Sequence, residues 1–271
     1  MPARLAALLA TALAAFPLAG CGADDVNPNA VAEAAEATQK QGAVHMTIDS
    51  TIEASGQTIP LKMEGDADLR DTRVHLKTDG GGGVPEMETV MIDTVMYMKM
   101  EGLEEQLGAE WVKFDLAEVG KGMGVDFEQL MQLGQGSPAE QLDYLRAMAD
   151  LEEVGTEQID GVETTHYKGV VDLRKYPDAV PESEREEARR SVDKLIELSG
   201  DATTPTEVWI DDESLVRRQK MTMTQTKPAK STTKMDIRFT DFGKSVSIEA
   251  PRGAKDITDL AKDSIEQGSG G

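Results

Sequence analysis

Apolar and polar residues alternate one by one over several stretches of the chain. Val44, Met46 and Ile48 are apolar, the residues between them are polar, and residues 59–69 and 74–76 repeat the pattern. This period of two predicts strands of an antiparallel sheet with one face on a core and one in water. Further β-forming runs predict strands at 90–100, 111–116, 152–159, 162–173, 206–210, 215–224, 233–242 and 245–249.

Turn signals separate these strands. Ser55-Gly56 follows the first strand, and Asp160-Gly161 lies between two β-forming runs. An Asp-Gly pair in that position predicts a two-residue hairpin turn. Residues 90–100 are expected to form another hairpin that turns near Asp93.

Helix signals are fewer. Asn27-Pro28 combines an N-cap with a proline at the first helical position and predicts a helix that ends at Gly42. A capping box at 183–186 predicts a second helix, which ends at Gly200. The residues expected to face inward from these two helices are Val31, Ala34, Ala35, Thr38, Ala188, Val192, Leu195 and Ile196. Two shorter helices are predicted at 127–133 and 138–148.

The order of these elements favours one α+β domain over residues 28–262. The chain contains no internal repeat and no Pro/Ser-rich linker that would divide it. Residues 263–271 are polar and rich in glycine, so they predict a flexible tail.

Residues 1–20 resemble an export signal. Residues 5–18 form an apolar run that is too short to span a bilayer comfortably. Ala19-Gly20 precedes Cys21, the one cysteine of the chain, and this arrangement resembles the lipobox of bacterial lipoproteins. The resemblance implies cleavage before Cys21, acylation of its thiol and a lipidated tether over 21–27. The alternative is an ordinary signal peptide that contains a cysteine.

The composition excludes several classes of partner. The chain has 28 lysine and arginine residues against 50 aspartate and glutamate residues, a formal net charge of −22. This acidity argues against nucleic-acid binding, because phosphate recognition needs a basic face. It also argues against electrostatic docking on anionic lipid. A single cysteine excludes an internal disulfide and argues against a cysteine-based metal site.

No catalytic or metal-binding arrangement stands out. His45, His75 and His166 are scattered without metal-ligand spacing, so they are expected to be structural or on the surface. The aspartates in 66–71 lack the spacing of a calcium loop, and the acidic cluster at 211–213 predicts a solvated turn. We therefore expect no cofactor, no metal and no enzymatic activity. An acid-pair hydrolase is the remaining enzymatic alternative.

Methionine is common at the apolar strand positions. The methionines in predicted strands are Met46, Met63, Met91, Met96, Met98, Met100, Met221, Met223 and Met235. The unbranched thioether side chains of methionine can adapt to the shape of an irregular bound molecule. A methionine-rich sheet face covered by few, short helices therefore favours a flexible acyl ligand. The alternative is that the methionines fill an ordinary core. The residues predicted to line a cavity are Val44, Met46, Ile48, Ile59, Leu61, Met63, Met96 and Met98.

Short segments spread over the chain also carry a family resemblance. They are QGAVHMT at 41–47, MYMK at 96–99, WVKFD at 111–115, DGVETTHY at 160–167, EVWID at 207–211, LVRR at 215–218, APR at 250–252 and DITDL at 256–260. In this order they resemble the actinobacterial LppX/LprAFG-type lipoproteins. The resemblance implies a LolA-like α+β fold, in which a curved antiparallel half-barrel sheet has helices packed in its concave mouth. Characterised members carry lipids or glycolipids in that cavity, whereas related half-barrels act as envelope-stress sensors.

Two functional hypotheses follow. In the first, acylated Cys21 anchors the chain on the extracytoplasmic face of the cell membrane, and the half-barrel binds the acyl chains of a lipid or glycolipid, as in lipid transfer. In the second, the same fold has a filled core and acts as a non-catalytic envelope sensor, or contacts another envelope protein through its acidic surface. Nucleic acid is not expected as a partner.

Overall fold

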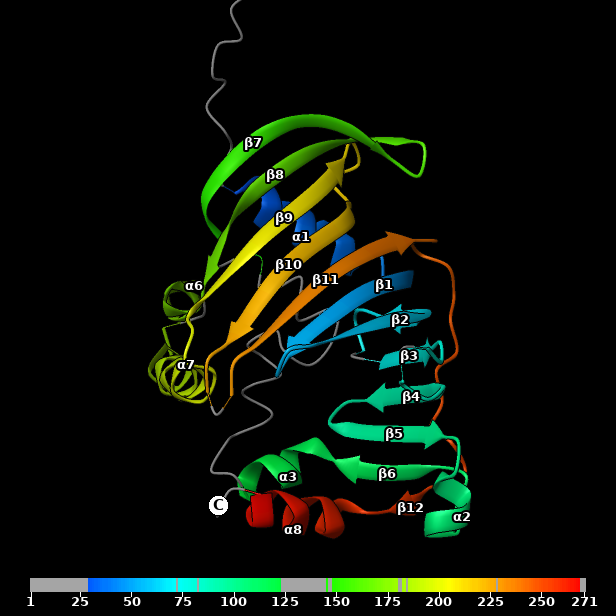
Figure 1. The fold of residues 1–271 in the computed structure, drawn as a ribbon. Coiled ribbons are helices and arrows are strands. Elements are labelled where there is room, and N and C mark those ends of the chain that lie inside the picture. Colours follow the sequence, from blue (N-terminus) through cyan, green and yellow to red (C-terminus); the bar gives the residue numbers. More distant parts are fainter. Residues whose placement is uncertain are drawn as a thin grey trace, which may run out of the picture.

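Twelve strands form the framework of the computed structural model (Figure 1). They are β1 (Ala43–Ala54), β2 (Gln57–Asp68), β3 (Arg73–Thr78), β4 (Met87–Ile92), β5 (Val95–Met100), β6 (Val112–Asp115), β7 (Met148–Ile159), β8 (Val162–Asp172), β9 (Thr203–Asp211), β10 (Val216–Gln225), β11 (Ser231–Thr240) and β12 (Lys255–Asp256). The structure describes residues 29–71, 73–81, 83–122, 145, 148–179, 182–183, 185–227 and 229–268.

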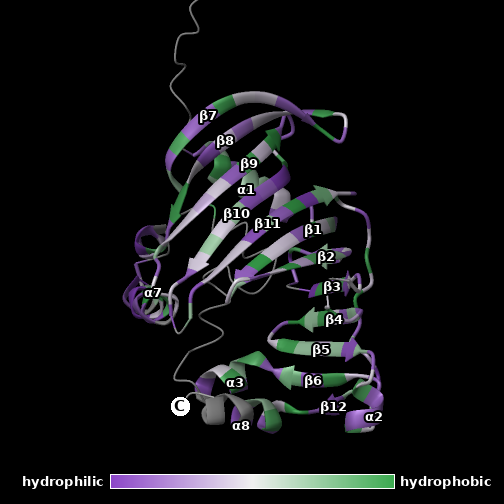
Figure 2. Ribbon diagram, viewed as in Figure 1, coloured by the Kyte–Doolittle hydropathy of each residue, from purple (hydrophilic) through white to green (hydrophobic). Residues whose placement is uncertain are grey.

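The strands make one open sheet, in the order β12-β6-β5-β4-β3-β2-β1-β11-β10-β9-β8-β7. Neighbouring strands run antiparallel, except that β12 pairs in parallel with β6. The chain therefore builds outward from β1 in one direction as far as β6 and returns through β7 to β11 on the other side. Figure 2 shows hydrophilic and hydrophobic residues alternating along the strands, as the sequence predicts.

The hairpin turns follow from their residues. Asp160 and Gly161, between β7 and β8, have φ angles of 50° and 83°, and Ser55 and Gly56 have φ angles of 53° and 79°. Positive φ at both central positions is the signature of a type I′ turn, which suits the right-handed twist of paired strands. Asp93, with a φ of 52°, stands at the predicted turn between β4 and β5. These turns fix the register of their hairpins.

Helix α1 (Ala30–Lys40) packs against the sheet with the face predicted from the sequence. Its buried residues are Val31, Ala34, Ala35 and Thr38. The Thr38 hydroxyl donates to the carbonyl of Ala34 at 2.7 Å and accepts the backbone N–H of Val216 at 2.9 Å, which ties the helix to the start of β10. Figure 1 shows α1 behind the sheet, where it contacts β9 and β10.

The remaining helices lie at the ends of strands. They are α2 (Leu103–Leu107), α3 (Leu116–Gly122), the 3₁₀ helix η3 (Leu173–Lys175), α6 (Tyr176–Ala179), α7 (Arg185–Ser199) and α8 (Thr258–Gly268). Helix α7 buries Ala188, Val192 and Leu195 against η3 and α6, as its apolar spacing predicts. It ends where the N–H of Gly200, with a φ of 74°, donates to the carbonyl of Ile196.

The predicted α+β fold class is confirmed: helices pack against a curved, open, mostly antiparallel sheet (Figure 1). One predicted strand is wrong. Residues 245–249 form no strand because they pass across the ends of other strands, where the carbonyl of Ile248 accepts a hydrogen bond from Arg73. Val246 is half-buried and Ile248 is buried, between exposed residues, and this burial produces the misleading alternation.

Several other predictions differ from the structure or fall outside it. Helices α2, α3, α6 and α8 and the 3₁₀ helix η3 are absent from the sequence prediction. Helix α8 continues to Gly268, into the segment 263–271 for which the sequence predicts a flexible tail. The helix predicted at 127–133 lies outside the described residues. Of the helix predicted at 138–148, the structure describes only Leu145 and Met148, and Met148 begins β7.

Candidate functional site

The eight apolar residues predicted to line a cavity share one face of the sheet. Ile48 of β1 pairs with Met63 of β2, and residues paired in an antiparallel ladder point to the same side. The pairing continues from β2 through β3 and β4 to Met96 of β5. We call this side the inner face. Its predicted members are Val44, Met46, Ile48, Ile59, Leu61, Met63, Met96 and Met98.

Burial divides the inner face into two parts. Val44, Met46 and Ile48 are buried in one apolar cluster with residues of α1 and with Leu145. The other part is only half-buried, and we call it the inner strip. It consists of Ile59, Leu61, Met63, Leu76, Met87, Met96, Met98, Met100, Met223 and Met235. The part against α1 is thus a packed core. Part of the inner strip packs against this core, through Met63, Leu76, Met223 and Met235, while the strip keeps some of its apolar surface accessible.

The methionines concentrate on the inner face. All nine methionines in the predicted strands lie in strands of the structure, and the register places each of them on this side. In β4 and β5 they stand opposite one another, as Met91 opposite Met96 and Met87 opposite Met100. A surface made of thioethers and aliphatic chains can adapt to a flexible apolar molecule.

The opposite, outer face is charged and paired. The Arg218 guanidinium donates to both carboxylate oxygens of Asp236, at 2.7 and 2.5 Å, and this bonding raises the pKa of Arg218. Lys62 lies 3.0 Å from Asp49, and Lys234 donates to Glu53 at 2.9 Å. These cross-strand pairs leave the outer face a solvated ionic surface.

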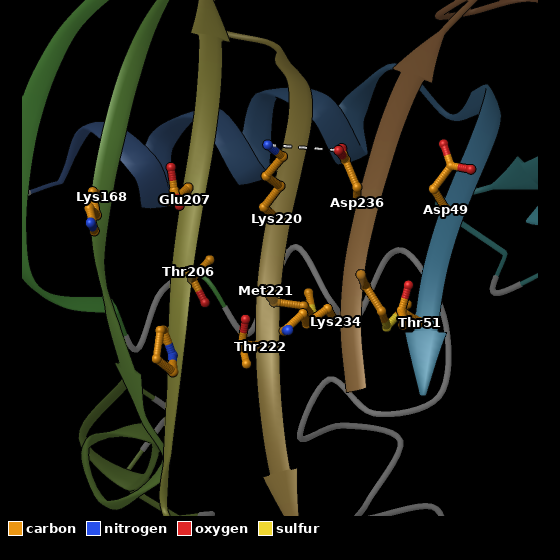
Figure 3. A pocket seen from close by; sticks show the side chains of 12 residues that line it. Asp49, Thr51, Lys168, Thr206, Glu207, Lys220, Met221, Thr222, Lys234 and Asp236 are labelled. Carbon is orange, nitrogen blue, oxygen red and sulfur yellow. Dashed lines mark ion pairs between the residues drawn. The ribbon is translucent and has the colours of Figure 1, made fainter. Parts of the chain in front are cut away.

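A groove of about 380 Å³ lies on this outer face (Figure 3). Figure 3 shows Lys220 and Asp236 side by side on β10 and β11, with α1 on the far side of the sheet. Lys168 and Glu207 extend the charged lining across β8 and β9. The alternating charges suit water and counter-ions better than an acyl chain.

The three histidines all lie beside carboxylates on the outer face. The Nδ1 atom of His45 is hydrogen-bonded to Oδ1 of Asp66 at 2.9 Å, and Nε2 of His75 is hydrogen-bonded to Oε1 of Glu88 at 2.6 Å. His166 bonds to Glu207 at 2.9 Å and stacks on the Trp209 ring, with 4.2 Å between the ring centroids. In the described ranges, no three His, Cys, Asp or Glu side chains gather as a metal site would require.

A second groove, of about 650 Å³, lies where β3, β4 and β5 approach α2. Glutamates dominate its lining, and two of them have hydrogen-bond partners. Lys99 donates to Glu110 at 2.5 Å, and this hydrogen bond raises the pKa of Lys99. His75 hydrogen-bonds to Glu88 at 2.6 Å. The groove is therefore a charged and mostly acidic surface.

Two of the buried polar residues, Asp211 and Gln219, are not expected from the sequence analysis. Asp211 begins the acidic cluster expected to be a solvated turn, yet its side chain is fully buried, whereas Asp212 and Glu213 are exposed. Its carboxylate accepts the backbone N–H groups of Glu213 and Leu215, at 3.0 and 2.8 Å, and pairs with Arg217. The second residue is Gln219, which stands in β10 at a position where the alternation predicts an apolar, inward-facing residue. That break in the alternation is visible in the sequence.

The predicted lipoprotein signal and acylation site stay predictions. Cys21, the signal at 1–20 and the tether at 21–27 lie outside the described residues. Among the helices that are described, none combines the length and apolarity needed to cross a membrane.

Comparison with known sequences gives distant relatives. No family model matches the chain. An uncharacterised 31.2 kDa protein of Streptomyces griseus, encoded in the rplA–rplJ intergenic region, is 29% identical over 165 residues, which are 59% of this chain and 51% of that protein. A candidate lipoprotein of Streptomyces coelicolor is 25% identical over 193 residues, 69% of this chain and 56% of that protein. The chain thus spans about half the length of the curated relatives it matches.

Comparison with solved structures covers more of the chain. The Mycobacterium tuberculosis lipoprotein LppX superposes with a TM-score of 0.50 at 13% identity, over 82% of this chain and 100% of LppX. LprF from Mycobacterium bovis gives a TM-score of 0.45 at 15% identity, over 83% of this chain and 96% of LprF. The resemblance to LppX/LprAFG-type lipoproteins that the sequence predicts is confirmed at the level of the fold.

Proposed function

We propose that this chain is an envelope lipoprotein that binds the acyl chains of a lipid or glycolipid on its inner strip. The half-buried strip of methionine and aliphatic side chains on the inner face supports this role. Covering such a surface contributes about 25 cal/mol for each Å² of apolar area removed from water. The proposed role is binding, and possession of the LppX fold is consistent with it without determining the ligand.

Native mass spectrometry of the full-length protein, purified from its own host in a mild detergent, tests this role. We expect a population whose mass exceeds that of the acylated chain by the mass of one or more lipids. Organic extraction of the same sample should release those lipids. Recovery of bare protein alone, together with no uptake of added lipid, would count against the proposal.

The anchor is a separate proposal. A membrane anchor with two or more acyl chains holds a protein stably, because each buried CH₂ contributes about 0.8 kcal/mol. Replacing Cys21 by serine removes the acylation site, so the variant is expected to move from the membrane fraction to the soluble fraction. Fractionation followed by immunoblotting measures this shift. A Cys21→Ser variant that stays in the membrane would show that something else anchors the chain.

The packed core beneath α1 favours the alternative role, a non-catalytic interaction module with a filled interior. Residues Val31, Ala34 and Ala35 of α1 are almost fully buried against the sheet, which is what a filled, non-catalytic interaction module would show. In that case the partner would be another envelope protein that contacts the charged outer face. The native mass spectrum distinguishes the two roles, because a filled module carries no lipid.

A further inference from the structure

Gln219 is a primary amide set within the apolar inner face. It lies in β10 and pairs across the sheet with Val208 of β9 and Ile237 of β11. Both neighbours are buried core residues, and Gln219 itself is 0% exposed. A glutamine at this depth is unusual, because long polar side chains are mostly found at the surface.

Neither end of this amide has a partner in the part of the chain that the structure describes. The Nε2 and Oε1 atoms of Gln219 are both buried without a hydrogen bond. A primary amide offers two donors and an acceptor with two lone pairs, and buried polar groups of this kind are nearly always bonded. Nearby buried hydroxyls follow that rule, since Thr38 bonds to Ala34 and Thr206 bonds to Thr204.

The amide stands at the deep end of a row of side chains. Gln219, Met221 and Met223 follow one another along the inner face of β10, and exposure increases from 0% at Gln219 through 5% at Met221 to the half-buried Met223. Met235 of β11 lies beside Met221. Two steps of two residues span about 14 Å in an antiparallel strand. The row therefore leads from accessible thioethers to an unsatisfied amide.

We infer that Gln219 recognises a polar group carried by the acyl ligand, an inference that rests on the proposed lipid-binding role. The amide Nε2 would donate to an oxygen of the ligand, and Oε1 would accept a hydrogen from it. The matching chemistry is a neighbouring acceptor and donor on an apolar chain. Such a pair occurs at a terminal carboxamide or protonated carboxyl, and also at a hydroxyl beside the carbonyl of a hydroxyacyl ester. The acyl chain of the ligand would lie along Met221 and Met223.

The test compares three apolar probes that differ in one group. Hexadecanamide and methyl 3-hydroxyhexadecanoate each present a donor and an acceptor, whereas methyl hexadecanoate presents acceptors only. Each probe competes with a fluorescent palmitoyl reporter on the full-length protein. We expect one of the first two to bind about tenfold more tightly than methyl hexadecanoate, the factor that corresponds to one added neutral hydrogen bond. Preference for hexadecanamide would place the recognised polar group at the end of the acyl chain, and preference for methyl 3-hydroxyhexadecanoate would place it beside a carbonyl within the ligand.

Two variants locate the effect. Gln219→Met removes the amide while keeping an unbranched side chain, so the preference should disappear and the melting temperature of the empty protein should not fall. Gln225→Met makes the same change at an exposed position of the same strand and should keep the preference. Equal binding of all three probes by the unsubstituted protein would overturn the inference, whether or not the variants fold. So would a Gln219→Met variant that folds and still prefers the same probe.

Failure of the two proposals can be told apart. If the unsubstituted protein binds the reporter but does not distinguish the probes, the acyl-binding role stands and the role of Gln219 is wrong. If the protein binds neither reporter nor probe and is recovered bare from its host, the acyl-binding role fails and the recognition by Gln219 fails with it.

Discussion

Replacing Asp211 by alanine is expected to lower the free energy of unfolding by about 3 kcal/mol. The Asp211 side chain is fully buried, whereas its partner Arg217 is 20% exposed. The carboxylate also holds the turn between β9 and β10, because it accepts the backbone N–H groups of Glu213 and Leu215. Alanine leaves those two donors and the arginine without their acceptor, and unsatisfied buried groups of this kind are costly.

Urea unfolding followed by circular dichroism measures this loss. The matched control is Asp212→Ala in the same turn, where the side chain is exposed and the change should stay within about 0.5 kcal/mol. Asp211→Asn keeps one acceptor oxygen for the turn but loses the charge that pairs with Arg217, so its loss should fall between those of the two alanine variants. If Asp211→Ala proves no more harmful than Asp212→Ala, the buried ion pair has no role in holding this turn.

The sequence predicts the sheet well because alternation reports directly on which side of a strand is buried. The phase of Val44, Met46 and Ile48 places all three on the inner face, and the Asp160-Gly161 turn fixes the register of its hairpin. Alternation fails where burial has another cause. Val246 and Ile248 alternate with polar residues and are half-buried and buried, but this segment crosses the ends of strands (Figure 1), and no strand forms there.

The depth of an individual polar residue is harder to predict. Asp211 and Asp212 are neighbours of the same type, yet one is buried under Arg217 and the other is exposed. That difference arises from contacts between separate parts of the turn, which no local pattern records. The division of the inner face has a similar origin, because it depends on where α1 lies across the sheet. Gln219 is the exception, since a polar residue in an apolar phase could be noticed in the sequence alone.

Introducing a charge into the inner strip is expected to weaken acyl binding by about a hundredfold, because a carboxylate would have to be buried against hydrocarbon without a partner. Met223 is suited to this test, since it is half-buried on the inner face near the accessible end of the β10 row. The matched control is Thr222→Glu. Thr222 is the adjacent residue, on the outer face, and it stands opposite Lys234, whose ammonium already donates to Glu53 and has further N–H groups for a second carboxylate.

Acyl binding on the inner strip is tested by titrating a fluorescent palmitoyl probe into the unsubstituted protein, Met223→Glu and Thr222→Glu. Thermal unfolding of each sample confirms that all three are folded. The acyl-binding account predicts saturable binding with the same Kd for the unsubstituted protein and Thr222→Glu, and a Kd about a hundredfold higher for Met223→Glu. Equal affinity in all three proteins, or no saturable binding by the unsubstituted protein, would contradict it.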